Sequence, residues 1–471
     1  MITWGISSES HNAALAVFAD DSLVFASESE RFSRIKNDPI IPDNLIHHAL
    51  QYGKPDLVCW YERPFIKQLR QLRAGQGLKE NFTEYIDAPV KFYGHHYTHA
   101  CGGYYTSRFR NACVVVIDAI GEFQTLTIWE AYNNNLTLRY QKRYPNSIGL
   151  WYTAMTQRCG LKPNEEEYIL MAMSALGDSN KLKQAMFDDF IGEDFKFKKN
   201  LHKGCKDWRP EENIHDIAAA TQDVYEILFE SILRKAKRLV NSDNLVLMGG
   251  CALNCAANPK AYSFFKNVWI MPAPGDNGSA IGAVLAHKKK HITYTPYTGV
   301  NITSKYDNEF IVDHLLDNKV CGIARGRAEF GPRALGNRSL LADPRDIGIK
   351  DRVNEIKGRE PFRPFAPVIL EEYSRIYFDL PVKRSPYMQF TAKCSFPDKY
   401  PGIVHVDGTS RVQTVTMRDN KPLYNLLRLW KGKTGCPMLL NTSLNVKGEP
   451  MVNDISDAKR FAKINNVEVF T

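Results

Sequence analysis

Two histidines and two aspartates in distant segments have the residue types and surroundings of a metal site. His95 and His99 are four residues apart, a spacing that places both imidazoles on one face of a helix. Asp118 follows an apolar strand, whose end can hold a carboxylate toward a cleft. Asp276 lies in the glycine-flanked loop 274–279, ahead of an Ala-rich helix whose free amides favour phosphate. Mixed His and Asp ligation predicts Fe, Mn or Zn rather than Ca, whereas the two histidines alone would also fit the polar start of an amphipathic helix.

Further positions near strand ends suit acid–base chemistry or nucleotide binding. His11 follows the first strand in a small polar loop and could take a proton from an alcohol nucleophile; the alternative is an ordinary loop hydrogen bond. His96, between the two candidate ligands, is interpreted as a supporting or structural residue. Gly249 and Gly250 end a strand ahead of Asn254, which permits close backbone approach to a nucleotide or simply forms a tight turn.

The downstream part of the chain has the composition of an anion site. Glycine, proline and aromatic residues separate its charges, which is unusual for a solvated basic face, and Arg forks bind phosphate bidentately. The cationic residues are Arg325, Arg327, Arg333, Arg338, Arg345, Lys357, Arg359 and Arg363. Ser443 and Asn445 follow an apolar strand and offer hydroxyl and amide groups to a nucleotide, or cap a turn. Two phosphate-handling sites in one chain indicate a two-step reaction with a carried intermediate.

The elements expected to position these residues alternate between strands and helices, which predicts an α/β fold. A strand at residues 2–6 is followed by a hairpin (13–18 and 23–26), and a strand at 113–117 is followed by another hairpin (126–131 and 136–140). This weak repeat indicates a duplicated domain. A helix at 215–240, strands at 245–248 and 268–271, and a helix from Ser279 complete it.

The chain of 471 residues is long enough for two domains. Polar, turn-rich residues at 291–303 predict a linker between a domain at 1–295 and a domain at 306–471 with strands at 320–324, 365–369 and 438–440. We expect no membrane span and no secretory signal, and the scattered cysteines favour a reducing cytoplasm. We expect a monomer or homodimer.

The net charge of +9 has two interpretations. It favours solubility, or it attracts a phosphorylated or polyanionic partner. The run Lys288-Lys289-Lys290 is either a solvated helix end or a nucleic-acid contact.

Taken together, these segments resemble the O-carbamoyltransferase family, which contains the tobramycin, cephalosporin and nodulation-factor carbamoyltransferases. The resemblance covers nearly the whole chain and depends on the His-x3-His pair, the strand ending at Asp118, and the segments 274–282, 331–339, 359–367 and 441–449. It implies an actin-like (ASKHA, duplicated) first domain fused to a YrdC-like α/β second domain.

The resemblance also implies a mechanism. The second domain would form carbamoyl-adenylate from carbamoyl phosphate and ATP with Mg, and the first would transfer the carbamoyl group to a substrate hydroxyl, releasing AMP. His95, His99, Asp118 and Asp276 would hold Fe(II), and His11 would be the base. Carbamoyl phosphate and ATP would be held, with Lys357 and Arg363 acting catalytically, by Arg333, Lys357, Arg363, Arg411, Ser443 and Asn445.

The acceptor is not decided by the residues. The positive charge favours a hydroxymethylated pyrimidine, such as 5-hydroxymethylcytosine in DNA or a nucleotide; the alternative acceptor is a small secondary metabolite. A further alternative of another class is a nucleotide-binding regulatory protein without transfer activity.

Overall fold

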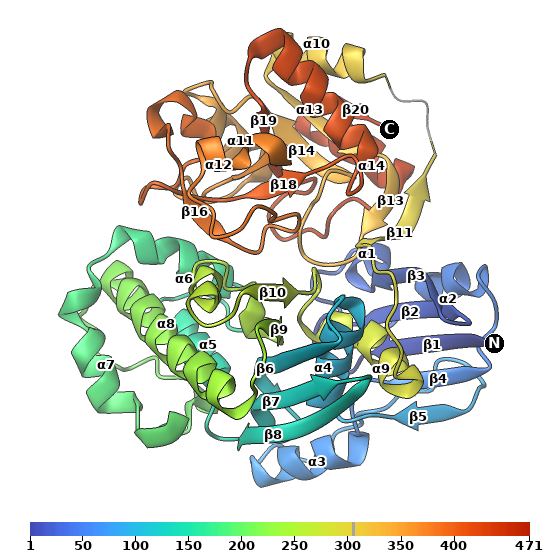
Figure 1. Cartoon of the computed structure of the whole chain (residues 1–471), viewed down its shortest axis with the longest axis vertical. Helices are drawn as coiled ribbons and strands as arrows, with labels where there is room; N and C mark the ends of the chain where they lie inside the picture. Colours follow the sequence, from blue (N-terminus) through green and yellow to red (C-terminus); the bar gives the residue numbers. More distant parts are fainter. Residues whose placement is uncertain (304–306) are drawn as a thin grey trace. The chain divides into compact units, whose positions relative to one another are not determined.

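The computed structural model describes residues 1–303 and 307–471 (Figure 1). The chain forms two compact units. One contains Met1–Ser33 and Asn37–Thr295, and the other contains Arg34–Lys36 and Pro296–Thr471. The second unit is therefore discontinuous in sequence. The predicted start of the second domain, at residue 306, lies outside the described residues.

The first unit contains two five-stranded sheets with the same topology. One sheet has the order β3-β2-β1-β4-β5 and the other β8-β7-β6-β9-β10, with an antiparallel three-stranded meander followed by two parallel strands in each. The strands are β1 (Ile2–Ser7), β2 (Ala14–Ala19), β3 (Ser22–Glu28), β4 (Leu57–Trp60), β5 (Val90–Phe92), β6 (Asn111–Gly121), β7 (Gln124–Tyr132), β8 (Asn135–Arg143), β9 (Asn244–Met248) and β10 (Asn267–Ile270). This repeated strand order confirms the predicted duplicated, actin-like α/β fold.

Helices connect and cover these sheets. They are α1 (Glu30–Ser33), α2 (Asp43–Leu50), α3 (Pro64–Arg73), α4 (His95–Thr106), α5 (Ile148–Arg158), α6 (Glu167–Met173), α7 (Lys183–Phe190), α8 (Ile214–Leu239) and α9 (Ser279–Lys288). Helix α4 follows the first sheet in sequence but packs against β6 and β9, and α9 follows the second sheet but packs against β1, β2 and β4. The two helices also contact each other between the sheets (Figure 1). Both are almost entirely buried, which explains why their sequences show little amphipathic pattern.

The second unit is built on a mixed six-stranded sheet with the order β18-β15-β19-β14-β12-β20. Two short ribbons, β11–β13 and β16–β17, accompany it. The strands are β11 (Tyr297–Ile302), β12 (Val320–Ala324), β13 (Gly326–Glu329), β14 (Arg338–Ala342), β15 (Ala366–Leu370), β16 (Thr391–Lys393), β17 (Thr409–Arg411), β18 (Gln413–Val415), β19 (Met438–Ser443) and β20 (Val469–Phe470). The helices are α10 (Asn308–Asn318), α11 (Ile349–Lys357), α12 (Ser374–Tyr377), α13 (Lys421–Thr434) and α14 (Ile455–Asn465). This unit is α/β as predicted; its YrdC-like assignment stays a prediction.

Part of the predicted linker is a strand. Residues 297–302 form β11, which pairs antiparallel with β13, and both Thr298 and Ile302 are buried. Pro296, Gly299 and Asn301 read as turn residues in the sequence, but the register is irregular between Tyr297 and Asn301, so the bulge accommodates Gly299 inside the strand.

Candidate functional site

The predicted metal ligands converge in the first unit. One ligand atom from each of His95, His99, Asp118 and Asp276 lies within 4.8 Å of the others. The Nε2 atoms of His95 and His99 are 3.1 Å apart, as expected for residues four apart on α4. Asp118 Oδ2 lies 3.1 Å from His95 Nε2, and Asp276 Oδ1 lies 3.4 Å from both imidazoles.

Asp118 does not end its strand, which runs on to Gly121, so that detail of the prediction is wrong. However, the pairing of β6 with β9 stops at Val116, and its regular pairing with β7 stops at Ile117. Asp118 is therefore the first residue of β6 beyond its regular pairing with β7 and β9. Asp276 begins a short 3-10 helix, Asp276–Gly278, that continues into α9.

Each carboxylate has one oxygen held by the protein and the other directed at the imidazoles. Asp118 Oδ1 accepts hydrogen bonds from the amides of Ala119 (2.8 Å) and Gly250 (3.4 Å). Asp276 Oδ2 accepts one from Ser10 Oγ (3.4 Å). Two imidazole nitrogens and two carboxylate oxygens thus face a common point, and this donor set fits a divalent transition metal.

The four side chains shift one another's pKa values. Burial alone would lower the pKa of His95, but the charge of Asp276 and hydrogen bonds to both aspartates raise that pKa well above 6.5. His99 behaves in the same way, since burial lowers its pKa while hydrogen bonds to Asp118 and Asp276 raise it. Burial raises the pKa of both carboxyl groups, yet their contacts with His95 and His99 leave each pKa below its usual value.

His96 is not part of this cluster. Its Nδ1 lies 3.0 Å from Thr127 Oγ1, and its fully buried ring has a pKa lowered by burial and by the charge of His95. Its neutral ring fills the helix–sheet interface, in agreement with the structural interpretation from sequence.

The other predicted residues of the first unit have different surroundings. His11 is exposed in the loop beside Ser10, which reaches Asp276. Gly249 has a φ of 89°, and a Cβ there would lie 2.1 Å from the carbonyl oxygen of Ile117, so the turn beside Asp118 requires glycine. Asn254 exchanges side-chain hydrogen bonds with Gln222 (3.0 and 3.1 Å), and its contact with a nucleotide stays a prediction.

In the second unit, Lys357 is the centre of the predicted anion site. It is buried, and its Nζ donates to Ser443 O (2.5 Å), Ser443 Oγ (3.2 Å), Asn445 O (2.7 Å) and Asn445 Oδ1 (3.0 Å). Burial, together with the charges of Arg359 and Arg363, lowers the pKa of Lys357 well below its usual value. Three predicted residues, Lys357, Ser443 and Asn445, are therefore in direct contact.

The segments that carry the other predicted cations lie near β19 or the loop that follows it. Arg363 pairs with Glu360 (3.4 Å), which also pairs with Lys447 in the loop after β19. Asn441, on β19, donates to Ala334 O (3.1 Å) and Gln413 Oε1 (2.7 Å). The segments that carry Arg333 and Arg411 therefore meet at β19. The Nε atom of Arg411 is buried without a hydrogen-bond partner among the described residues.

Three of the arginines predicted from the sequence as anion ligands have protein partners in the described structure. Arg338 is fully buried, and its guanidinium donates to the carbonyl groups of five residues: Val300, Arg325, Gly326, Asn337 and Asn453. Arg345 is paired with Asp343 (2.8 Å). Arg359 lies 3.9 Å over the ring of Phe365 and donates to Asn354 Oδ1. A sequence cannot distinguish a guanidinium that stabilises backbone carbonyls from one that awaits a phosphate.

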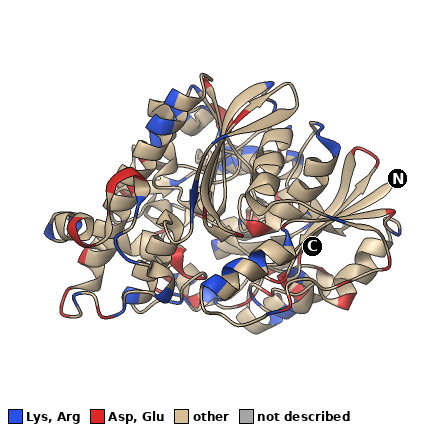
Figure 2. Ribbon diagram, turned by 90° about the horizontal axis from the view of Figure 1, so that it is seen from below, with Lys and Arg blue, Asp and Glu red and all other residues tan. Residues whose placement is uncertain are grey.

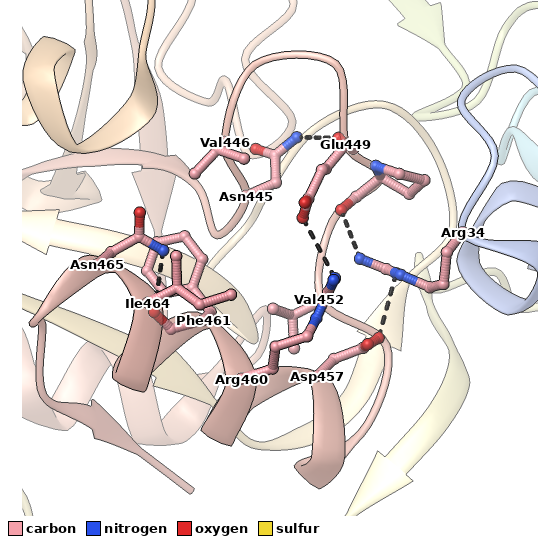
Figure 3. A pocket seen from close by; sticks show the side chains of 11 residues that line it. Arg34, Asn445, Val446, Glu449, Val452, Asp457, Arg460, Phe461, Ile464 and Asn465 are labelled. Carbon is pink, nitrogen blue, oxygen red and sulfur yellow. Dashed lines mark hydrogen bonds and ion pairs between the residues drawn. The ribbon is translucent and has the colours of Figure 1, made fainter.

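A small pocket adjoins the loop after β19 (Figure 3). Arg34, which sequence reasoning missed, lies at its edge and donates to Met451 O (2.7 Å) and Pro450 O (2.9 Å). Its guanidinium also pairs with Asp457 (3.1 Å). On the inner side of the loop, Asn445 Nδ2 donates to Glu449 O (2.6 Å). The loop that supplies the partners of Lys357 is thus held from two sides.

Comparisons with known proteins identify the class of protein. The family description "Carbamoyltransferase N-terminus" matches residues 60–285, and "Carbamoyltransferase C-terminus" matches residues 312–471. An uncharacterized protein of Synechocystis sp. is 32% identical over 97% of this chain and 93% of its own length. The chain belongs to the carbamoyltransferase family, which confirms the family and the enzyme class predicted from sequence.

Two named relatives are similar over much of their length. Nodulation protein NolO of Bradyrhizobium diazoefficiens is 31% identical over 77% of this chain and 75% of its own length. The 3'-hydroxymethylcephem-O-carbamoyltransferase of Amycolatopsis lactamdurans is 28% identical over 95% of this chain and 94% of its own length. Within the described residues, no helix is both long and apolar enough to cross a membrane.

Proposed function

We propose that this chain is an ATP-dependent O-carbamoyltransferase that forms carbamoyl-adenylate in its second unit and transfers the carbamoyl group to a hydroxyl in its first. The observation that carries the proposal is the convergence of His95, His99, Asp118 and Asp276 within 4.8 Å in a chain of this family. Water would first release phosphate from carbamoyl phosphate, the resulting carbamate oxygen would attack the α-phosphate of ATP and release pyrophosphate, and transfer of the carbamoyl group to the hydroxyl would release AMP.

In the second unit, Lys357, Arg333, Arg363 and Arg411 would bind the phosphate groups of carbamoyl phosphate and ATP. Cations fixed at one strand end stabilise charge that develops during phosphoryl and adenylyl transfer. The lowered pKa of Lys357 supports this role, because an anion beside this buried amine would favour its charged form.

In the first unit, the four ligands would hold Fe(II), Mn or Zn, with Fe(II) as the proposed metal. When bound, such a metal supplies Lewis-acid stabilisation to the phosphate of the adenylate. His11 would accept the proton of the acceptor hydroxyl, since its exposed ring follows Ser10 in the loop that reaches Asp276. Gly249 and Gly250 would allow the nucleotide to approach the turn beside Asp118, and Mg would accompany ATP.

The proposed acceptor is a hydroxymethylated pyrimidine, in DNA or as a nucleotide. The name of the Amycolatopsis relative specifies a hydroxymethyl acceptor, and the net charge of +9 suits an anionic one. Basic and acidic residues are both scattered along the ribbon (Figure 2), and Asp21 pairs with both Lys288 and Lys290. Because acidic residues neutralise part of the basic charge locally, a small neutral metabolite is the alternative acceptor. For such an acceptor the net positive charge would only maintain solubility.

Mass spectrometry tests this proposal directly. The protein is incubated with ATP, carbamoyl phosphate and either hydroxymethylcytosine-containing DNA or a panel of nucleotides and small alcohols. A carbamoyl group on the DNA base, with activity that falls steeply as salt increases, supports a DNA acceptor. Modification of neutral alcohols alone assigns the metabolite alternative. Failure to form AMP with any acceptor, or without one, would refute the two-step reaction.

A further inference from the structure

The two ring nitrogens of His95 face different groups. Its Nε2 faces His99 Nε2 and Asp118 Oδ2, each at 3.1 Å, and is the nitrogen available to a metal. Its Nδ1 is directed away from that point, is buried, and has no hydrogen-bond partner in the described structure. The carboxylate of Glu62 lies on this side of the ring, with its Oε2 3.8 Å from Nδ1.

Glu62 is a buried carboxylate held by a buried cation. Its side chain is only 3% exposed, and its Oε1 accepts a 2.6 Å hydrogen bond from Lys67 Nζ, at 7% exposure. Lys67 also donates to Glu9 O at 2.7 Å. Glu9 precedes Ser10 and His11 in the loop after β1, so one ammonium group contacts both the carboxylate beside His95 and this loop.

A metal at Nε2 requires the imidazole proton to be on Nδ1, and that proton requires an acceptor. We propose that Glu62 is a positioning residue for the metal centre, which accepts the Nδ1 proton of His95 and thereby directs the Nε2 lone pair at the metal. This inference rests on the proposed metal site. Lys67 holds Glu62 in place and compensates its charge in this buried position.

The competing explanation is that Glu62 serves only as the counter-ion of Lys67. Loss of one partner of a buried pair leaves an uncompensated charge and destabilises the fold, whatever the role of the pair. Removal of both charges together separates the explanations. A purely structural pair predicts that the double variant recovers metal binding, whereas the positioning role predicts that binding stays weak.

The experiment is a cobalt(II) titration of the full chain, with affinity measured by chelator competition and ligand geometry by the visible absorption of the bound ion. The variants are Glu62→Gln, Glu62→Gln combined with Lys67→Met, and Asp276→Asn as a lost-ligand reference. Glu130→Gln is the matched control, because Glu130 is a half-exposed carboxylate paired with Arg139. We expect Glu62→Gln and the double variant to bind cobalt(II) about 10–100-fold more weakly than the wild type, with a shifted spectrum.

The outcomes distinguish a failure of the proposed metal site from a failure of the proposed role of Glu62. Absence of cobalt(II) binding by the wild type, or unchanged binding by Asp276→Asn, overturns the proposed metal site and the inference with it. Wild-type affinity in Glu62→Gln, while Asp276→Asn is impaired, overturns the inference alone. If Glu62→Gln does not fold, the double variant decides, and its recovery of wild-type affinity would show that Glu62 only neutralises Lys67.

Discussion

Replacement of Gly282 by alanine would test whether the packing of two helices sets the spacing of the metal ligands. A Cβ at Gly282, in α9, would lie 2.1 Å from the carbonyl oxygen of Thr98, in α4. Contacts to a Cβ essentially never fall below 3.0 Å, so the two helices must separate by about 0.9 Å. Thr98 lies between the two histidine ligands, and α9 begins three residues after Asp276.

The separation therefore acts directly on the distance between imidazoles and carboxylate. Metal sites tolerate deviations of roughly ±0.2 Å in ligand distance, several times less than the required shift. We expect Gly282→Ala to lose most of its cobalt(II) affinity although all four ligands are retained. Overpacking should also lower the free energy of unfolding of the first unit by about 1–3 kcal/mol, measurable by urea denaturation.

Two other glycines provide matched controls. A Cβ at Gly102, on the facing helix, would have its nearest neighbour at 3.4 Å, and one at Gly432, in α13, would have no atom within 4 Å. Gly102→Ala should bind cobalt(II) almost as the wild type does, and Gly432→Ala should stabilise its helix by about 0.5–1 kcal/mol. Wild-type affinity in Gly282→Ala, or an equal loss in Gly102→Ala, would refute the reasoning.

Three further predictions follow from the described contacts. Because the pKa values of His95 and His99 are raised above 6.5, protons compete with the metal, and the apparent cobalt(II) affinity should rise with pH through the neutral range; a flat profile would contradict this. Lys357→Met should reduce AMP formation from ATP and carbamoyl phosphate about 10²–10³-fold without altering cobalt(II) affinity, and a loss of both would indicate general misfolding. Arg34→Gln removes hydrogen bonds to two carbonyl groups and an ion pair, so amides of residues 443–452 should lose about 1–3 kcal/mol of protection in hydrogen exchange, whereas the exposed control Arg139→Gln should not affect them.

Much of the proposed metal cluster could be predicted from the sequence, because each proposed ligand has a local signal. The i, i+4 spacing of His95 and His99 needs only a helix, and Asp118 and Asp276 each come after a run of apolar residues in the sequence. The duplication was also visible, since each copy begins with a strand and a hairpin. The convergence of the four proposed ligands could only be assumed from the sequence. It depends on α4 packing against the second sheet and α9 packing against the first, and on the contact between these two helices.

The supporting residues had no such signal. Glu62 lies just before α3 and Lys67 lies near the start of that helix, and in the sequence they resemble an ordinary surface pair until their burial and the orientation of His95 are known. For Arg338 the signal in the sequence is misleading. Its glycine-rich surroundings are typical of a phosphate site, although its guanidinium donates to backbone carbonyl groups. Strand β11 was missed because a bulge places turn residues within it.

The discontinuity of the second unit has a consequence for how such chains can be rearranged. Arg34–Lys36 belong to this unit, but 259 residues of the other unit separate them from Pro296. A gene fragment beginning at Pro296 would encode the sheet and Lys357 without the guanidinium that holds Pro450 and Met451. A single crossover at this boundary would therefore combine the C-terminal half of one protein with residues 34–36 of another. Chimaeras should keep the loop at Pro450 and Met451 in place only when residues 34–36 come from the same parent as the C-terminal half.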